Sequence, residues 1–279
     1  MAKVDWVTIE LDRTPWASAV SYWHPPRIVE SAWLEHGPFA FWIMSALRPS
    51  TVVELGTHNA FSFFTFCEAA QRLGLDGRLY AVDTWEGDDH AGFYTDEVYT
   101  DVLAVKESQY DERAVLLRGY FADFVDTFAD GSIDLLHIDG RHAYEDVKED
   151  FESWIPKVAE HGIVLFHDTA VLDRGFGVRQ FFAELGERYP TFQFTHGNGL
   201  GVLSVGTPTP AMASFFEAGP DEVERIRGFY AERGATVTAQ YHAGLIVADA
   251  HRRELDAFRE STSWKLTKPV RAVGKLLGR

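Results

Sequence analysis

Short hydrophobic runs alternate, between residues 51 and 205, with longer segments in which hydrophobic positions recur at helical spacing. The short runs predict strands at residues 51–55, 78–83, 114–118, 133–139 and 162–168. The clearest helical pattern covers residues 143–158, where apolar and acidic residues take opposite faces. Strands that alternate with amphipathic helices favour an α/β fold with a parallel sheet covered by helices.

The segments that flank this region have different patterns. A helix predicted at residues 178–189 precedes two strand-like pieces around a Gly-Asn-Gly turn, which predicts a closing hairpin. Residues 51–206 therefore form the predicted main domain. Residues 1–50, rich in Trp and Pro with one helix at 32–47, are interpreted as a cap or lid, and residues 207–260 as a helical extension.

Composition and charge narrow the class of protein. With 46% hydrophobic and 24% charged residues the chain has a globular composition, and its net charge of −16 disfavours nucleic acid as a partner while favouring cationic ligands. The single cysteine, Cys67, excludes an intrachain disulfide and fits a reducing compartment. Because the start lacks an apolar signal core and no apolar run approaches the ~20 residues of a spanning helix, we expect a cytoplasmic protein.

The final segment, residues 261–279, differs from the acidic body because it holds five basic residues and no acidic one. Beyond Pro269, basic and apolar positions follow at steps of three and four, which predicts an amphipathic helix with Trp264 as an interfacial anchor. We expect this tail to dock on an anionic membrane, at its inner face, or on a partner such as a glycosyltransferase. The alternative is that it packs on the acidic body or on a second subunit of a homo-oligomer.

Candidate chemistry lies where the predicted strands end, since ligands of open parallel sheets bind outside the carboxyl ends of the strands. The first strand ends with Glu54 and Gly56, and the second with Asp83, a carboxylate suited to the hydroxyls of a ribose. Only one glycine is present in the first loop, so the GxGxxG fingerprint is absent and a nicotinamide enzyme is disfavoured.

Two further strands end with carboxylates, Asp139 and Asp168. If these strands are neighbours, both side chains face one crevice, where with His167 they could hold a hard cation such as Mg²⁺. The alternative is that each carboxylate only caps a turn or helix. His142 stands at a helix start, where the macrodipole disfavours its protonation and a neutral imidazole could accept a proton. His137, inside an apolar run, is interpreted as a core residue.

The segments ELGTHNAFS, DTWEGD, HIDGRHAYEDVKEDF and HGIVLFHDT together resemble class I S-adenosylmethionine-dependent methyltransferases, of the metal-assisted sugar or polysaccharide O-methyltransferase branch. The resemblance covers about residues 50–205 and implies a doubly wound, seven-stranded, mostly parallel Rossmann-like sheet with a terminal antiparallel hairpin. It implies cofactor contacts from Glu54, Gly56, Thr57, Ser62, Asp83, Trp85, Tyr120, Phe121 and Asp139.

The resemblance also implies that Asp139 and Asp168 bind a divalent metal, with Mg²⁺ expected, and that His142 acts as the base. Two departures from the family pattern affect the site: Ala60 replaces a glycine usual in the first motif, and His167 stands where related sugar enzymes can carry a carboxylate ligand. The acceptor pocket is expected to form from residues 1–50, 86–110 and 169–177.

The sequence thus predicts an O-methyltransferase that acts on a sugar hydroxyl, with a bacterial surface polysaccharide or related glycan as the acceptor class. Two other readings stay open. One is a non-haem iron oxygenase with His137, Asp139 and His167 as ligands. The other is a non-catalytic module that keeps a cofactor fold and binds a glycosyltransferase or membrane.

Overall fold

The computed structural model describes residues 14–88, 92–172 and 175–267. Its main sheet has seven strands in the order β5-β2-β1-β6-β7-β9-β8, and β9 alone runs antiparallel to both of its neighbours. The strands are β1 (Thr51–Leu55), β2 (Arg78–Asp83), β5 (Ala114–Arg118), β6 (Ile133–Ile138), β7 (Val158–His167), β8 (Thr191–Phe194) and β9 (Leu200–Ser204). This arrangement confirms the predicted mostly parallel α/β sheet with its terminal hairpin.

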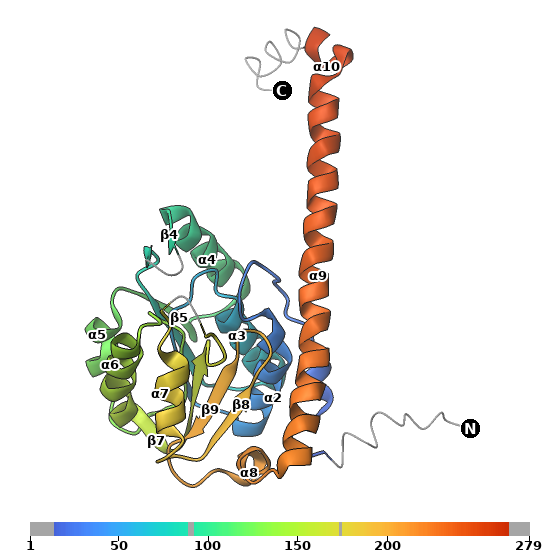
Figure 1. Cartoon of the computed structure of the whole chain (residues 1–279). Helices are drawn as coiled ribbons and strands as arrows, with labels where there is room; N and C mark the ends of the chain where they lie inside the picture. The colour runs from blue at the N-terminus through green and yellow to red at the C-terminus, as the bar shows by residue number, and fades with distance from the viewer. Residues whose placement is uncertain (1–13, 89–91, 173–174, 268–279) are drawn as a thin grey trace. The chain divides into compact units, whose positions relative to one another are not determined.

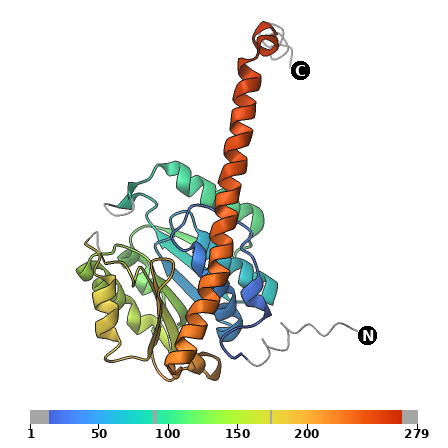
Figure 2. The ribbon, with the colours of Figure 1, turned by 45° about the vertical axis from the view of Figure 1, so that its right-hand side comes forward.

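Helices cover both faces of the sheet (Figure 1). On one side lie α2 (Gly37–Leu47) and α3 (Phe61–Leu73), and on the other lie α5 (Phe121–Phe124), α6 (Tyr144–Trp154) and α7 (Val178–Leu185). The same two layers are visible after the molecule is turned (Figure 2). A short ribbon of β3 (Gly87–Asp88) and β4 (Gly92–Phe93) precedes α4 (Asp96–Gln109).

Some predicted boundaries were wrong. The helical pattern read over residues 143–158 ends earlier, because α6 stops at Trp154 and a 3-10 turn, Ile155–Lys157, leads directly into β7. Pro156 explains the difference, since it has no backbone N–H to continue an α-helix. The helix expected over 178–189 is likewise shorter and ends at Leu185.

Residues 14–50 belong to the core rather than forming a separate cap. Eight of the eleven residues of α2 are buried, and this helix packs against α3. A helix that is hydrophobic all round must be covered on every side, which explains why the segment is integrated. The 3-10 helices Ala19–Tyr22 and Leu34–His36 lead into it, so only the second part of the helix predicted at 32–47 is α-helical.

The chain divides into two compact units, residues 1–237 and 238–279. After α8 (Pro210–Phe216), the long helix α9 (Pro220–Glu260) confirms the helical reading of residues 220–260. Ile226, Tyr230, Gly234 and Val237 are buried in the first unit, whereas most side chains beyond them are exposed. The second unit continues with α10 (Thr262–Leu266); residues 268–279 of the predicted tail helix lie outside the described residues.

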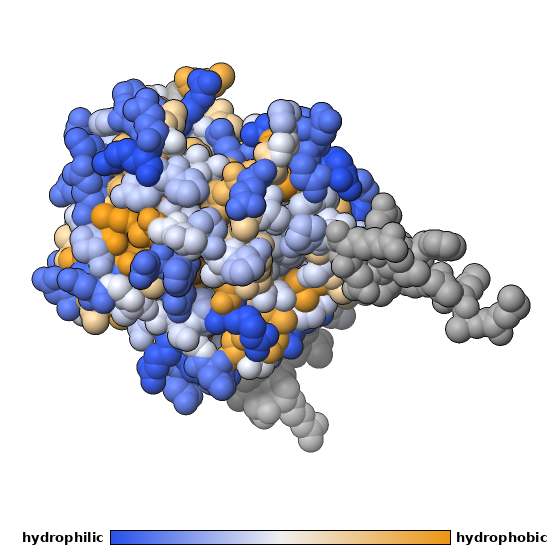
Figure 3. Space-filling view, turned by 90° about the horizontal axis from the view of Figure 1, so that it is seen from below, coloured by the Kyte–Doolittle hydropathy of each residue, from blue (hydrophilic) through white to orange (hydrophobic). Residues whose placement is uncertain are grey.

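Seen from the side of α8, the hydrophobic surface residues form small groups separated by hydrophilic ones (Figure 3). Among the described helices, none has the length and apolar character needed to cross a membrane.

Candidate active site

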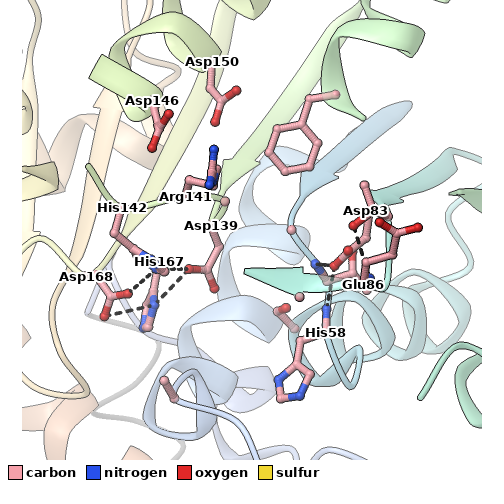
Figure 4. A pocket seen from close by; sticks show the side chains of 18 of the residues that line it. His58, Asp83, Glu86, Asp139, Arg141, His142, Asp146, Asp150, His167 and Asp168 are labelled. Carbon is pink, nitrogen blue, oxygen red and sulfur yellow. Dashed lines mark hydrogen bonds and ion pairs between the residues drawn. The ribbon is translucent and has the colours of Figure 1, made fainter. Parts of the chain in front are cut away.

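A cavity of about 870 Å³ opens at the carboxyl ends of β1, β2, β6 and β7. It lies where the strand order reverses, because β2 and β6 flank β1 on opposite sides. Its lining brings together ten predicted site residues: Gly56, Thr57, Ser62, Asp83, Tyr120, Phe121, Asp139, His142, His167 and Asp168. Figure 4 shows the two acidic groups of the cavity, one around Asp83 and the other around Asp139 and Asp168.

Asp139, His142 and Asp168 form a compact cluster. Their ligand atoms all lie within 4.8 Å of one another. His142 Nε2 is 2.8 Å from Asp168 Oδ2 and 3.8 Å from Asp139 Oδ1. Asp168 directly follows β7 and has a φ of 60°, a left-handed conformation that aspartate tolerates better than most residues. The cluster therefore has the oxygen-rich ligand set that a hard divalent cation prefers.

The charges of this cluster stabilise one another. Burial opposes ionisation, but hydrogen bonds to Asp139 and Asp168 outweigh it and raise the pKa of His142 to about 9. Burial likewise favours the neutral acids, yet the histidine partners lower the pKa of Asp168 to about 2 and that of Asp139 still further. The expectation of a neutral His142 was wrong, because the two carboxylates outweigh the helix dipole.

His167 contacts the cluster from the side of the sheet. Its Nδ1 lies 3.3 Å from Asp139 Oδ1 and 3.5 Å from Asp168 Oδ1, and its Nε2 is 3.2 Å from the carbonyl of Gly197. Burial would lower the pKa of His167, but Asp139 raises it to about 10. His167 is thus an ion-pair partner of both carboxylates and lies outside the three-residue group that could hold an ion among the described residues.

Asp83 organises the loop after β1. Its Oδ2 accepts hydrogen bonds from the backbone N–H groups of Thr57 (2.7 Å) and His58 (2.9 Å), and its Oδ1 accepts one from Trp85 N–H (2.7 Å). Gly56 in this loop has a φ of +87°, and a Cβ there would lie 2.0 Å from the carbonyl oxygen of Asp139. The glycine is therefore required by the approach of the Asp139 backbone as well as by the turn.

Two predicted cofactor residues, Glu54 and Trp85, do not line the cavity. Glu54 is fully buried, where desolvation raises its pKa, and one of its oxygens lies 2.9 Å from His137 Nδ1. This pair agrees with the reading of His137 as a core residue. Trp85 is also buried and donates from its indole N–H to the carbonyl of His58. Trp85 thus supports the loop after β1, whereas Glu54 is paired inside the sheet.

Other lining residues were not singled out from the sequence. The ring of Phe176 stacks on His142 with centroids 4.2 Å apart and planes 8° apart, and Tyr94 stacks on His58 at 4.5 Å. Glu30, Glu86 and Asn198 also reach the cavity. The expected acceptor segments do converge here, since residues 30–32, 86–87, 93–94 and 176 all contribute to the lining. Their turn-like sequences carried no signal that identified the individual side chains.

Comparison with known proteins agrees with this geometry. Residues 53–169 match the family model described as a methyltransferase domain. A relative from Sinorhizobium fredii, the uncharacterized protein y4gI, is 52% identical over 176 residues, which cover 63% of this chain and 19% of the relative. The matched stretch is thus about a fifth of that longer protein.

One solved structure with the same fold is a proposed caffeoyl-CoA O-methyltransferase from Staphylococcus aureus. Its TM-score is 0.50 at 15% identity, and the match covers 64% of this chain and 86% of that one. The O-methyltransferase TomG from Streptomyces achromogenes was solved in complex with SAM. It has a TM-score of 0.48 and 18% identity, and the match covers 71% of this chain and 99% of TomG. Residues 53–169 of this chain are thus similar to a methyltransferase domain, and the order of its sheet is that of the Rossmann-like fold seen in the staphylococcal structure.

Proposed function

We propose that this protein transfers a methyl group from S-adenosylmethionine to a hydroxyl group of a sugar or glycan, with help from a divalent cation. The observation that carries the proposal is that the loop fixed by Asp83 and the cluster of Asp139, His142 and Asp168 line one cavity. A methyltransferase must place its donor and acceptor side by side, and this cavity offers a distinct set of polar groups for each.

The residues present fit both implied groups. On the donor side, Gly56, Thr57 and Ser62 border the cavity next to Asp83, and the aromatic pair Tyr120 and Phe121 lies at the end of β5. On the acceptor side, two carboxylates and an imidazole converge within 4.8 Å, which suits Mg²⁺ or a similar ion. The cofactor supplies an electrophilic methyl group, and a bound cation supplies a charge that lowers the pKa of a hydroxyl.

The side chains then have separate tasks. Asp139 and Asp168 would hold the cation, and His167 orients both carboxylates through its Nδ1. With its two carboxylate partners neutralised in this way, the imidazole of His142 would lose its proton more easily and would act as the base for the acceptor hydroxyl. Phe176, stacked on His142, keeps the ring in one plane. The acidic side chains that line the cavity, such as Asp146 and Asp150, and the ring of Phe176 suit an acceptor that carries many hydroxyl groups and is uncharged or cationic.

The two other readings receive less support. His137 is fully buried against Glu54 and does not line the cavity, so it is not placed with Asp139 and His167 as an iron ligand. A non-catalytic module would not need the donor and acceptor groups in one cavity. Titration of the full chain with S-adenosylmethionine and with its demethylated product separates the proposals: one saturable site is expected, and no heat of binding for either ligand would contradict a methyltransferase function.

We also propose that the basic segment 261–279 docks on an anionic membrane or on a glycosyltransferase that works on the same glycan. In its described part, the hydroxyl of Ser261 caps α10 by accepting from Trp264 N–H, and the Trp264 ring packs on Phe258. Leu266 is 75% exposed. A basic segment with an exposed apolar side chain is the combination that an anionic interface favours.

A further inference from the structure

The carboxylate of Asp83 has little remaining capacity for hydrogen bonds. A carboxylate has about four acceptor positions, two on each oxygen. The N–H groups of Thr57 and His58 occupy both positions on Oδ2, and Trp85 N–H occupies one on Oδ1. One position is left, whereas a ribose presents two neighbouring hydroxyl groups. Asp83 can therefore accept a hydrogen bond from only one of them.

A second carboxylate stands beside Asp83 at the same end of the cavity, that of Glu86 (Figure 4). The Glu86 side chain is exposed and lines the cavity, and its carboxylate has no hydrogen bond or ion pair with another residue in the described ranges. Arg118, whose charge interacts with Glu86, is already paired with Asp96. The Glu86 carboxylate is thus available to a ligand.

The backbone of Glu86 is fixed by two hydrogen bonds, although its side chain has none in the described ranges. Its N–H donates to the hydroxyl of Thr84 at 3.2 Å, and its carbonyl accepts from Tyr94 N–H at 3.0 Å. The next residue, Gly87, has a φ of +77°, and a Cβ there would lie 1.9 Å from the carbonyl oxygen of Gly92. The β3–β4 ribbon therefore fixes the position from which the Glu86 side chain enters the cavity.

Four other acidic side chains of the cavity are poorly placed for this task. Asp139 and Asp168 pair with the histidines of the cluster. Asp146 and Asp150 lie across the cavity from Asp83 (Figure 4). Among the labelled carboxylates, only Glu86 shares the Asp83 end.

We propose that Glu86 accepts a hydrogen bond from the ribose hydroxyl that Asp83 cannot bind. Glu86 would then recognise the ribose of the cofactor, while Asp83 mainly positions the loop after β1. This inference rests on the proposed binding of S-adenosylmethionine. It assigns a role in ligand binding to Glu86, three positions after Asp83, the acid at the end of β2 that the sequence pattern singled out.

The test is calorimetric titration of the full chain with S-adenosylhomocysteine and with its 2′-deoxy and 3′-deoxy analogues. Glu86→Gln is expected to weaken binding of the parent ligand about tenfold or more, because a charged acceptor is lost. Glu107→Gln removes the same charge from the exposed face of α4, outside the cavity, and serves as the matched control with unchanged affinity.

The deoxy analogues give the decisive comparison. One of them is expected to bind wild-type protein more weakly than the parent ligand but to show no such loss in Glu86→Gln, since hydroxyl and carboxylate act as a pair. Asp83→Asn is expected to lower both affinity and the unfolding temperature, as a positioning residue should. Equal deoxy penalties in wild type and Glu86→Gln, or an unchanged affinity of that variant, would overturn the inference. Absence of binding to wild-type protein would overturn the proposed function itself.

Discussion

The imidazole Nε2 of His142 lies 2.8 Å from Oδ2 of Asp168, which joins the start of α6 to the residue that follows β7. The contact forms because β6 and β7 are parallel neighbours and therefore end at the same edge of the sheet. The left-handed backbone of Asp168 occurs at this same point. The proposed base His142 and the candidate metal ligand Asp168 thus lie together because of the strand order, although they are far apart in the sequence.

Replacing His142 is expected to separate catalysis from cofactor binding. His142→Ala should lower turnover by about 10²–10⁴, because proton transfer is lost, while the affinity for S-adenosylhomocysteine changes little. Initial rates and calorimetry on the same preparation check both parts. His242→Ala, an exposed histidine of the second unit, is the control and should keep full activity. A fully active His142→Ala would remove this residue from the mechanism.

Metal affinity should depend on pH with a definite sign. The pKa of His142 is raised to about 9, so a divalent cation that binds at neutral pH must either displace the proton of His142 or bind next to its positive charge. Apparent Mg²⁺ affinity is therefore expected to rise from pH 7 through pH 9 and to level off only above the pKa of His167, which is about 10, because that imidazolium also contacts both carboxylates.

Calorimetric titrations with Mg²⁺ at both pH values measure this dependence. In His142→Gln, which cannot carry the proton, the change between pH 7 and pH 9 should be much smaller. An affinity that falls as pH rises, or the same slope in wild type and variant, is incompatible with the proposed cluster.

Ala60 offers a test on stability. It has a φ of 61° and is fully buried at the start of α3, in the conformation that glycine adopts most easily. Relief of the left-handed strain should exceed the gain in unfolded-state entropy, so Ala60→Gly is expected to raise the free energy of unfolding by about 0.5–1 kcal/mol. Ala69→Gly, inside the right-handed part of α3, should instead lower it by about 1 kcal/mol or more. Urea unfolding of both variants measures these changes. A lower free energy of unfolding in Ala60→Gly would show that the packing of the Ala60 methyl group outweighs the backbone strain.

The tail is tested by vesicle co-sedimentation. The full chain is expected to bind vesicles with anionic headgroups and to be released by salt, while a chain that ends at Glu260 stays in the supernatant. Neutral vesicles are the control for apolar insertion alone. Equal behaviour of the two chains on anionic vesicles would end the membrane proposal and leave a protein partner or a second subunit as the target.

Much of the fold was predictable because strands and amphipathic helices leave local patterns. The bounds of β1, β2 and β5 match their hydrophobic runs, and the carboxylates at the ends of the strands were identified from position alone. Pro156 shows where the pattern misled, since apolar spacing continued through a residue that ends the helix.

The remaining parts of the site depend on how distant segments meet. Glu54 looked like a cofactor ligand because it ends a strand, but its partner across the sheet is His137, and the pair is buried. The contact of Phe176 with His142 depends on the path of a loop. The same holds for Glu86, whose direction is set by the β3–β4 ribbon.

The most direct test of the whole account is the transfer of a labelled methyl group from S-adenosylmethionine to a panel of glycans, with the protein used as purified, after exhaustive chelation and after Mg²⁺ is restored. We expect a labelled glycan whose formation stops on chelation, resumes with Mg²⁺ and fails in Asp139→Asn and Asp168→Asn. Labelling that proceeds at the full rate without a divalent cation, or that survives in both variants, would contradict the proposed role of the Asp139, His142 and Asp168 cluster. Absence of any labelled glycan would contradict the proposed acceptor class.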